Sequence, residues 1–254
     1  MHFISETVAD GVLERTFELS VAGETVTGVL WTPVGASTEL PVLLMGHGGS
    51  QHKKAPGVEF RARGFVTTLQ IAVAAIDAPS HGGRPASEEF ARFAATLRLK
   101  MANAEPVGPD IARENARQTL QAVPEWIATL DALHMLQVVG PNQRVGYWGM
   151  SMGGAIGVQL VANEPRIRAA VLGLVGLLPG EDALAAAAAR IQVPVEYVVQ
   201  WGDELVPRDS SFALFDALGS RDKSLHANPG GHMVRLPEHE TESWQRFFKR
   251  HLLA

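Results

Sequence analysis

The sequence predicts an α/β fold built around a mostly parallel β-sheet. The first observation is that short, wholly apolar runs of strand length alternate with helical patterns from residue 41 onwards. Parallel strands are buried on both faces, so they read as continuous apolar runs. The second observation is a Gly-x-Ser-x-Gly motif at a point where one such run changes into a helical pattern. Repeated strand–helix units of this kind imply a parallel sheet with right-handed crossovers.

The N-terminal third of the chain begins with a different pattern. Residues 12–20 and 25–32 alternate between apolar and polar and are joined by a Gly-containing turn, which predicts an antiparallel hairpin. Residues 41–46 are wholly apolar and predict a buried strand. A helical pattern follows at 57–70, and residues 72–76 predict a second buried strand.

Residues 85–111 fit no strand and predict a small helical lid. Their large apolar side chains recur at helical spacing, and a Pro-Val-Gly-Pro sequence at 106–109 ends the helix. We expect part of this apolar stripe to face the substrate. The side chains concerned are Phe90, Phe93, Leu97 and Met101.

The rest of the chain alternates regularly. A long amphipathic helix is predicted from Asp110 to about Gln137, with a kink or break at Pro124. The whole chain, residues 1–254, is expected to form one α/β domain with the lid inserted at about 85–111. The later strands are predicted at 144–148, 169–174, 193–200 and 223–227, and the later helices from Ser151 and at 182–190, 208–218 and 238–252.

Composition excludes several classes of function. The net charge is −5 and no basic patch stands out, so we expect no binding to nucleic acid or to an anionic membrane. The chain has no cysteine, which rules out disulfides, thiolate metal sites and a cysteine nucleophile. The first residues have neither a basic start nor an apolar core, and no apolar run is long enough to span a membrane. These features favour a cytoplasmic location.

The Gly-x-Ser-x-Gly motif is formed by Gly149, Ser151 and Gly153. A strand–turn–helix context of this kind is typical of a nucleophile elbow, in which a tight turn exposes the serine hydroxyl. Side chains two residues away would clash in such a turn, which explains the two glycines. We therefore predict that Ser151 is a catalytic nucleophile.

A serine hydroxyl needs a base to remove its proton and an acid to orient that base. Asp203 directly follows the predicted strand at 193–200, and His232 follows a Gly-Gly pair after the last strand. Their order, Ser then Asp then His, is the one typical of a nucleophile elbow in this kind of sheet. Glu204 is the nearest alternative for the acid. Glu181 and Asp182 form a second pair of alternatives. The histidines at other positions, His226, His239 and His251, are interpreted as structural or solvated.

A tetrahedral intermediate needs two N–H donors for its oxyanion. Met152, directly after the nucleophile, would supply one. The loop His47-Gly48-Gly49-Ser50 after the strand at 41–46 would supply the other, with Gly49 as the preferred donor and Ser50 as the next candidate. Ser50 is also expected to contact the substrate. His47 is expected to brace this loop by hydrogen bonding.

Two further clusters look functional at first sight. Residues 77–84 contain Asp77, Ser80 and His81, but these are too close in sequence to form a triad, so we interpret the segment as a braced loop at the rim of the site. Lys53 and Lys54 are either a solvated turn or a recognition site for a substrate carboxylate.

No histidine or carboxylate spacing predicts a metal site, and no phosphate-binding loop is present, so no cofactor is expected.

Five motifs, in their order along the chain, resemble those of the α/β-hydrolase superfamily. Together they extend over almost the whole chain. Within this superfamily the chain is most similar to the dienelactone hydrolase-like and small bacterial carboxylesterase branches, since no large cap separates residues 174 and 193. True dienelactone hydrolases have a cysteine where this chain has Ser151. The resemblance implies an eight-stranded, mostly parallel sheet and hydrolysis without a cofactor. The motifs are Gly-x-Ser-x-Gly at 149–153, His-Gly-Gly at 47–49, Asp-x-Pro-x-His-Gly at 77–82, Gly-Asp-x-x-Val-Pro at 202–207 and Gly-Gly-His at 230–232.

Together these features predict a serine hydrolase that cleaves a carboxylic ester, lactone or thioester of a small molecule. Ser151 attacks, His232 transfers the proton, Asp203 orients the imidazole, and the N–H groups of Met152 and Gly49 bind the oxyanion. One alternative is hydrolysis of a C–C or amide bond by the same triad. Another is a non-catalytic ligand-binding module of the same fold. A monomer and a homodimer are both compatible with the sequence.

Overall fold

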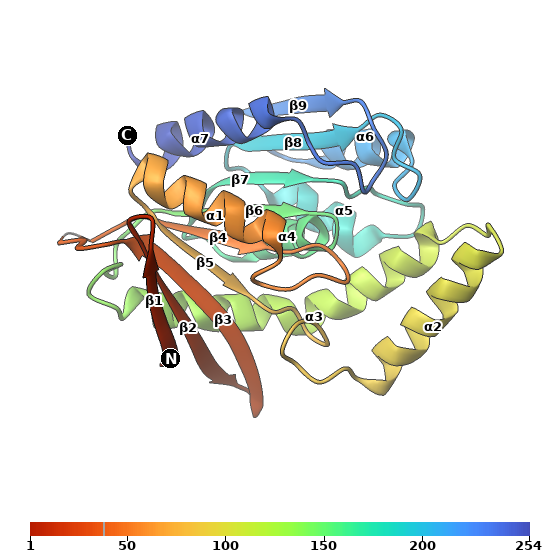
Figure 1. Ribbon diagram of the computed structural model, residues 1–254. Coiled ribbons are helices and arrows are strands. Elements are labelled where there is room, and N and C mark those ends of the chain that lie inside the picture. Colours follow the sequence, from red (N-terminus) through yellow and green to blue (C-terminus); the bar gives the residue numbers. More distant parts are fainter. Residues whose placement is uncertain (38) are drawn as a thin grey trace.

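The computed structural model describes residues 1–37 and 39–254, which form a nine-stranded sheet with helices on both faces (Figure 1). The strand order is β1-β2-β3-β5-β4-β6-β7-β8-β9. The first three strands are antiparallel to their neighbours, and the strands from β5 to β9 are parallel. The strands are β1 (His2–Ala9), β2 (Val12–Val21), β3 (Glu24–Pro33), β4 (Val42–Gly46), β5 (Ala72–Ile76), β6 (Val145–Met150), β7 (Ile167–Gly173), β8 (Val195–Gln200) and β9 (Lys223–Asn228).

The sheet has one strand more than the eight that the resemblance implied. The additional strand is β1, which pairs antiparallel with β2 at the edge of the sheet. Its side chains are almost all exposed, so it lacks the apolar alternation by which β2 and β3 were found in the sequence. Backbone pairing with β2, including an irregularity between Phe3 and Ser5, specifies this strand instead.

The seven helices are distributed over the two faces of the sheet and one projecting arm. Helices α1 (Pro56–Leu69) and α7 (Glu238–Leu252) contact each other and cover one face, around a core that contains Phe65, Trp148 and Trp244. The opposite face carries a second core with Tyr147 and Tyr197. The helices packed there are α3 (Gly108–His134), α4 (Met152–Asn163), α5 (Asp182–Arg190) and α6 (Arg208–Ala217).

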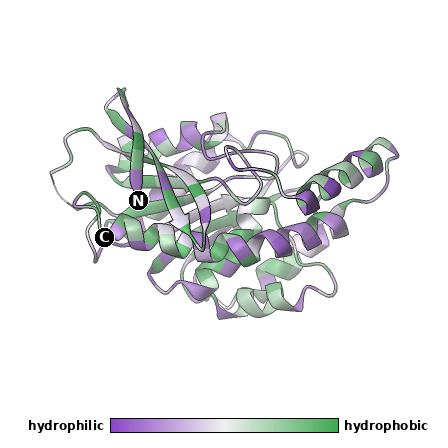
Figure 2. Cartoon of the chain, turned by 90° about the horizontal axis from the view of Figure 1, so that it is seen from below, coloured by the Kyte–Doolittle hydropathy of each residue, from purple (hydrophilic) through white to green (hydrophobic). Residues whose placement is uncertain are grey.

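Helix α2 (Glu88–Ala102) confirms the helix predicted between residues 85 and 111, and it lies away from the sheet. Together with the first turns of α3 it extends to one side of the molecule in two views that differ by 90° (Figures 1 and 2). Ser87 caps it by accepting a hydrogen bond from the Phe90 N–H at 3.1 Å. None of its side chains is buried. Figure 2 shows hydrophilic and hydrophobic residues mixed along it.

The long helix α3 begins two residues earlier and ends three residues earlier than the sequence pattern indicated. It is continuous through Pro124, where the predicted break is wrong. Proline removes one N–H from the helical ladder. Buried side chains on both sides of it, such as Ala122 and Trp126, hold the helix against the core and offset that loss.

The parallel strands place their carboxyl ends at one edge of the sheet, so the loops that follow β4, β6, β8 and β9 lie near one another. The predicted catalytic residues are on these loops. In the described part of the chain, no helix combines the length and the apolar character that crossing a membrane requires.

Candidate active site

Ser151 occupies a tight turn between β6 and α4. Its backbone has φ 57° and ψ −121°, an unfavourable conformation for a residue with a side chain. Its N–H donates a hydrogen bond to the Gly173 carbonyl at 2.9 Å. A Cβ on Gly149 would lie 2.4 Å from the Gly153 carbonyl oxygen, and a Cβ on Gly153 would lie 2.6 Å from that of Gly46. The turn therefore requires both glycines of the motif.

Three side chains from three loops form one hydrogen-bonded chain. Ser151 Oγ lies 2.9 Å from His232 Nε2, and His232 Nδ1 lies 2.7 Å from Asp203 Oδ2. The side chains of His232 and Asp203 are only 7% and 3% exposed. An ionised carboxylate can only accept, so Nδ1 carries the proton and Nε2 presents its lone pair to the serine hydroxyl.

Asp203 is the acid that contacts His232, and each rival has a different partner. The second oxygen of Asp203 accepts the N–H groups of Leu205 and Val206 at 2.9 and 2.8 Å. These bonds fix the carboxylate relative to its own loop. Glu204 accepts the backbone N–H of His232 at 3.0 Å, so it holds the main chain of the base rather than its ring.

The second pair of rival acids lies on the loop and helix after β7. Glu181 accepts the N–H of Leu178 at 2.7 Å and closes that loop. Burial raises the pKa of its carboxyl above the ordinary value. Asp182 is in the first turn of α5, where a carboxylate interacts favourably with the helix dipole.

The other histidines have structural surroundings, as expected. His226 Nδ1 lies 2.9 Å from Glu240 Oε2, and the hydrogen bond to this carboxylate raises the pKa of His226. Asn228 donates to the other oxygen of Glu240 at 2.7 Å. On α7, His239 is exposed, and His251 is half-buried against the ring of Phe247.

The loop after β4 lies beside the serine. Gly49 is exposed there, and its N–H donates to no other described residue. Met152 is the first residue of α4, so its N–H has no partner within the helix. Ser50 adopts a left-handed conformation at φ 59° and lines neither of the two cavities beside Ser151, so the structure does not place it next to a substrate.

His47 braces this loop, as predicted. Its Nδ1–H donates to the Gly48 carbonyl at 2.8 Å, and its Nε2 accepts the N–H of Ala78 at 3.0 Å. The ring therefore ties the loop after β4 to the loop after β5 in its neutral form. Burial lowers the pKa of His47 to about 4, in agreement with this neutral state.

The segment at residues 77–84 is a braced loop, as predicted. Asp77 is fully buried and accepts the N–H groups of Lys53 and Gly83 and the hydroxyl of Thr27, at 2.7 to 3.0 Å. These bonds hold the pKa of Asp77 below its ordinary value, against the opposite effect of burial. Arg84, at the end of the loop, forms a buried ion pair with Glu125.

The two lysines that were candidates for binding a substrate carboxylate already have carboxylate partners. Lys53 Nζ lies 2.5 Å from Asp77, and Lys54 Nζ lies 2.5 Å from Glu14. Neither side chain lines a cavity at Ser151. The Lys53 pair joins the loop after β4 to the loop after β5, and the Lys54 pair, whose lysine stays 38% exposed, joins the same loop to β2.

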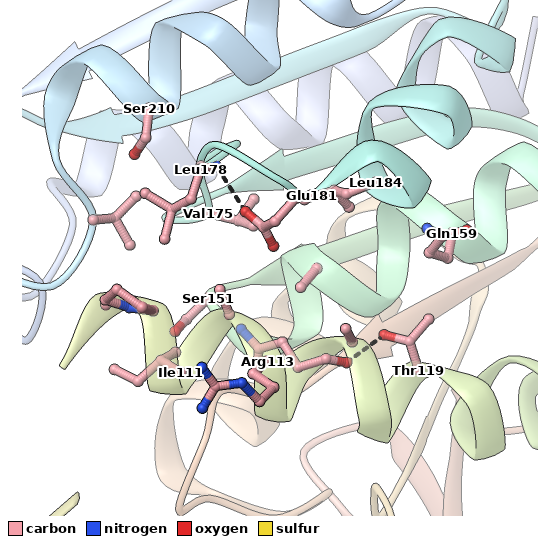
Figure 3. Close-up of a pocket in the computed structure, with 18 of the residues that line it drawn as sticks. Ile111, Arg113, Thr119, Ser151, Gln159, Val175, Leu178, Glu181, Leu184 and Ser210 are labelled. Carbon is pink, nitrogen blue, oxygen red and sulfur yellow. Dashed lines mark hydrogen bonds between the residues drawn. The ribbon is translucent and has the colours of Figure 1, made fainter.

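A large cavity of about 960 Å³ opens at Ser151 and His232. Figure 3 shows Ile111 and Arg113 of α3 on one side of it and Leu178 and Glu181 of the loop after β7 on the other, with Ser151 between them. Its walls are mostly apolar. The apolar lining side chains include Ile111, Val123, Leu174, Val175, Leu178 and Leu184.

The structure does not bring the predicted lid side chains to this cavity. The lining residues come from α3, α4, the first turns of α5 and α6, the loops after β7 and β8, and the catalytic residues Ser151 and His232, and none comes from α2. Phe90 instead contacts the ring of His81 in a tilted arrangement with ring centroids 4.8 Å apart, and Phe93 contacts Phe90. Leu97 is partly buried, and Met101 is 54% exposed. An amphipathic pattern marks α2 as a helix but does not show which surface it meets.

A second, smaller cavity of about 180 Å³ also opens at Ser151. It shares Ser151 and His232 with the large cavity and adds the oxyanion loop, with Gly48 and Gly49, as one wall. The other wall contains Arg61 of α1 and Arg235. Neither arginine was predicted from the sequence as a site residue. For Arg61 the sequence held one signal, a positive charge on a helix with no carboxylate three or four residues away, whereas Arg235 lies outside the helices and held none.

Among the described residues, no cluster of three or more His, Asp or Glu side chains has the geometry to hold a metal ion.

Comparisons with known proteins agree with this architecture. No protein-family model and no curated protein matches the chain. Among solved structures, a cold-adapted esterase from an Arctic intertidal metagenomic library, solved in complex with PEG, is 32% identical, with a TM-score of 0.79 over 99% of this chain and 100% of that one.

Two more distant structures show the same fold. The acetyl xylan esterase from Paenibacillus sp. R4 is 19% identical, with a TM-score of 0.74 over 99% of this chain and 88% of that one. The dienelactone hydrolase from Anabaena variabilis is 20% identical, with a TM-score of 0.67 over 95% and 99%. The chain therefore belongs to the α/β-hydrolase superfamily, and it is a carboxylesterase-like hydrolase.

Proposed function

We propose that the protein hydrolyses small carboxylic esters through an acyl-enzyme formed on Ser151. The observation that carries this proposal is the hydrogen-bonded chain from Ser151 Oγ to His232 and from His232 to Asp203, at 2.9 and 2.7 Å. These distances are within the range needed for proton transfer between nucleophile and base.

In the first half of the reaction, His232 Nε2 takes the hydroxyl proton as Ser151 Oγ attacks the ester carbonyl carbon. Asp203 accepts the Nδ1–H, which keeps the imidazole in the required tautomer and stabilises the imidazolium that forms. The N–H groups of Met152 and Gly49 are the donors for the oxyanion. The imidazolium then protonates the leaving alcohol, and the acyl group stays on the serine.

In the second half, His232 removes a proton from water, and the resulting hydroxide attacks the acyl-enzyme. The acid is released and Ser151 regains its proton. The large cavity between α3 and the loop after β7 takes the apolar substituent of the ester, because its walls are mostly apolar and it opens at the serine.

Covalent labelling tests the nucleophile directly. A fluorophosphonate probe is expected to modify one residue, Ser151, as located by peptide mass spectrometry. The Asp203→Asn variant is expected to react far more slowly, because the imidazole is no longer held in the right tautomer. Retained esterase activity after labelling, or a label on Ser50 or Ser80, would show that another group is the nucleophile.

A further inference from the structure

The small cavity beside Ser151 contains positive charge without a compensating carboxylate. Arg61 and Arg235 both line it, and no Asp or Glu does. Neither arginine forms an ion pair with any described residue. Partly buried charges are normally paired, so the half-buried Arg61, which has the exposed Arg235 beside it and no acid, is unusual.

Arg61 is held in place by contacts that leave its hydrogen-bonding capacity largely unused. Its guanidinium carbon lies 5.4 Å from the ring centroid of Trp148 and 5.6 Å from that of Trp244. One terminal N–H₂ group donates to the Gly57 carbonyl at 2.7 Å. The Nε atom is buried and has no partner among the described residues. The aromatic rings fix the charge, while several of its donors stay free.

Two other features of the cavity also supply hydrogen-bond donors or positive charge without a partner. The indole N–H of Trp148, which lines the cavity, is buried without a partner in the described structure. Arg235 lies over the ring of Phe60 at 5.7 Å, and its charge adds to burial in lowering the pKa of Arg61. The two guanidinium groups therefore repel each other, and an anion between them would relieve this repulsion.

We propose that the small cavity is a subsite for an anionic substituent of the ester, most simply a carboxylate, bound by Arg61 and Arg235. An arginine fork matches the geometry of a carboxylate, and a volume of about 180 Å³ accommodates a carboxylate with a few carbon atoms. The substrate is then two-sided: an apolar group lies in the large cavity and an anionic group in the small one. The inference rests on the proposed function, because both cavities meet at Ser151.

Matched pairs of charged and neutral substrates test this subsite. For a charge on the acyl side, the 4-nitrophenyl half-ester of adipic acid is compared with 4-nitrophenyl hexanoate. For a charge on the alcohol side, the butyrate ester of 3-hydroxybenzoate is compared with that of 3-hydroxybenzamide. The readout is the ratio of kcat/KM for the charged substrate to that for its neutral partner, measured at low and at high salt.

In at least one pair, Arg61→Gln and Arg235→Gln are each expected to lower this ratio about tenfold or more, since a hydrogen bond to a charged group is lost. Added salt is expected to lower the ratio in the wild type and not in the double variant. Arg168→Gln is the matched control, because Arg168 is exposed on β7 and lines neither cavity. It removes the same charge and leaves the ratio unchanged.

Three results would overturn the subsite. They are an unchanged ratio in both pairs for Arg235→Gln, an equal loss for charged and neutral substrates, or a ratio that does not respond to salt. Arg235 is exposed, so its variant folds even if Arg61→Gln does not. Failure of the proposed function can be distinguished from failure of the subsite. If the proposed function is wrong, Ser151→Ala still hydrolyses the neutral esters. Failure of the subsite alone leaves Ser151→Ala inactive.

Discussion

The loops that carry Ser151, Asp203 and His232 and the projecting helix α2 are built in opposite ways. Ser151 is in an unfavourable backbone conformation, and the side chains of Asp203 and His232 are almost wholly buried with their hydrogen-bonding groups paired. Helix α2 has regular geometry, a capped first turn and no buried side chain. Tertiary contacts hold the first region in place, whereas local propensity and capping maintain the second.

The difference between the two regions shows which part of the molecule requires an exact geometry. A strained turn persists only where the surrounding structure determines its geometry, and here Gly46, Gly149 and Gly153 make room for it. A helix with no fully buried side chain can change its sequence with little effect on the sheet. Substitutions in the two regions should therefore have very different consequences, and four experiments measure that difference.

The largest effect is expected at Ser151. Ser151→Ala and Ser151→Gly should each lower kcat about a millionfold, as loss of a triad nucleophile does. Glycine should in addition relieve the unfavourable φ of 57°, so we expect Ser151→Gly to be more stable than Ser151→Ala by about 1 kcal/mol in urea denaturation. Residual activity at a tenth of the wild type would rule out this nucleophile. Equal stability of the two variants would show that the turn is not strained.

The next effect separates the two neighbouring acids. Asp203→Asn should keep the fold and lower kcat roughly ten-thousandfold, because the amide favours the wrong imidazole tautomer. Glu204→Gln should lower it only about tenfold, since Glu204 contacts the backbone N–H of His232 and not its ring. Steady-state kinetics on a 4-nitrophenyl ester would measure both. The opposite order would assign the role of the acid to Glu204.

A stability effect is expected at His47, which joins two loops in its neutral form. Burial lowers its pKa from 6.5 to about 4, so its contribution to stability is complete above about pH 6.5 and is lost as the pH falls towards 4. The difference in unfolding free energy between the wild type and His47→Gln should fall by about 2 to 3 kcal/mol between about pH 7.5 and pH 4.5.

Urea denaturation at a series of pH values checks this effect. The comparison of the wild type with His47→Gln contains its own control. The other titrating groups contribute equally to both proteins and cancel in the difference in unfolding free energy. A difference that stays constant with pH, or that grows as the solution is acidified, would show that His47 accepts a proton in the folded state.

The smallest effect concerns the choice of acyl chain. Ile111→Ala and Leu184→Ala enlarge the large cavity and should change the ratio of kcat/KM for 4-nitrophenyl octanoate to that for the acetate by about tenfold. Phe93→Ala and Leu97→Ala on α2 should change it by less than about twofold. The expectation from the sequence, that α2 contacts the acyl chain, predicts the reverse ranking, and the same esters decide between the two.

The sequence by itself determined those features whose cause is local. The Gly-x-Ser-x-Gly elbow, the buried parallel strands and the loops carrying Asp203 and His232 are each specified by residues within a few positions, so their places along the chain could be predicted. The order of Ser, Asp and His then implied that they meet, since parallel strands bring their carboxyl ends to one edge. The bracing role of His47 was also predicted, as the more common role for a histidine in such a loop.

Only the tertiary structure decided what each surface meets. It showed that Lys53 and Lys54 are already paired with acids far away in the sequence, and that α3 rather than α2 forms the wall of the large cavity. It brought Arg61 and Arg235, 174 positions apart, to one small cavity. Partners of this kind are chosen by the packing of distant elements, and a hydrophobic or charged residue in a sequence carries no record of which distant surface it will contact.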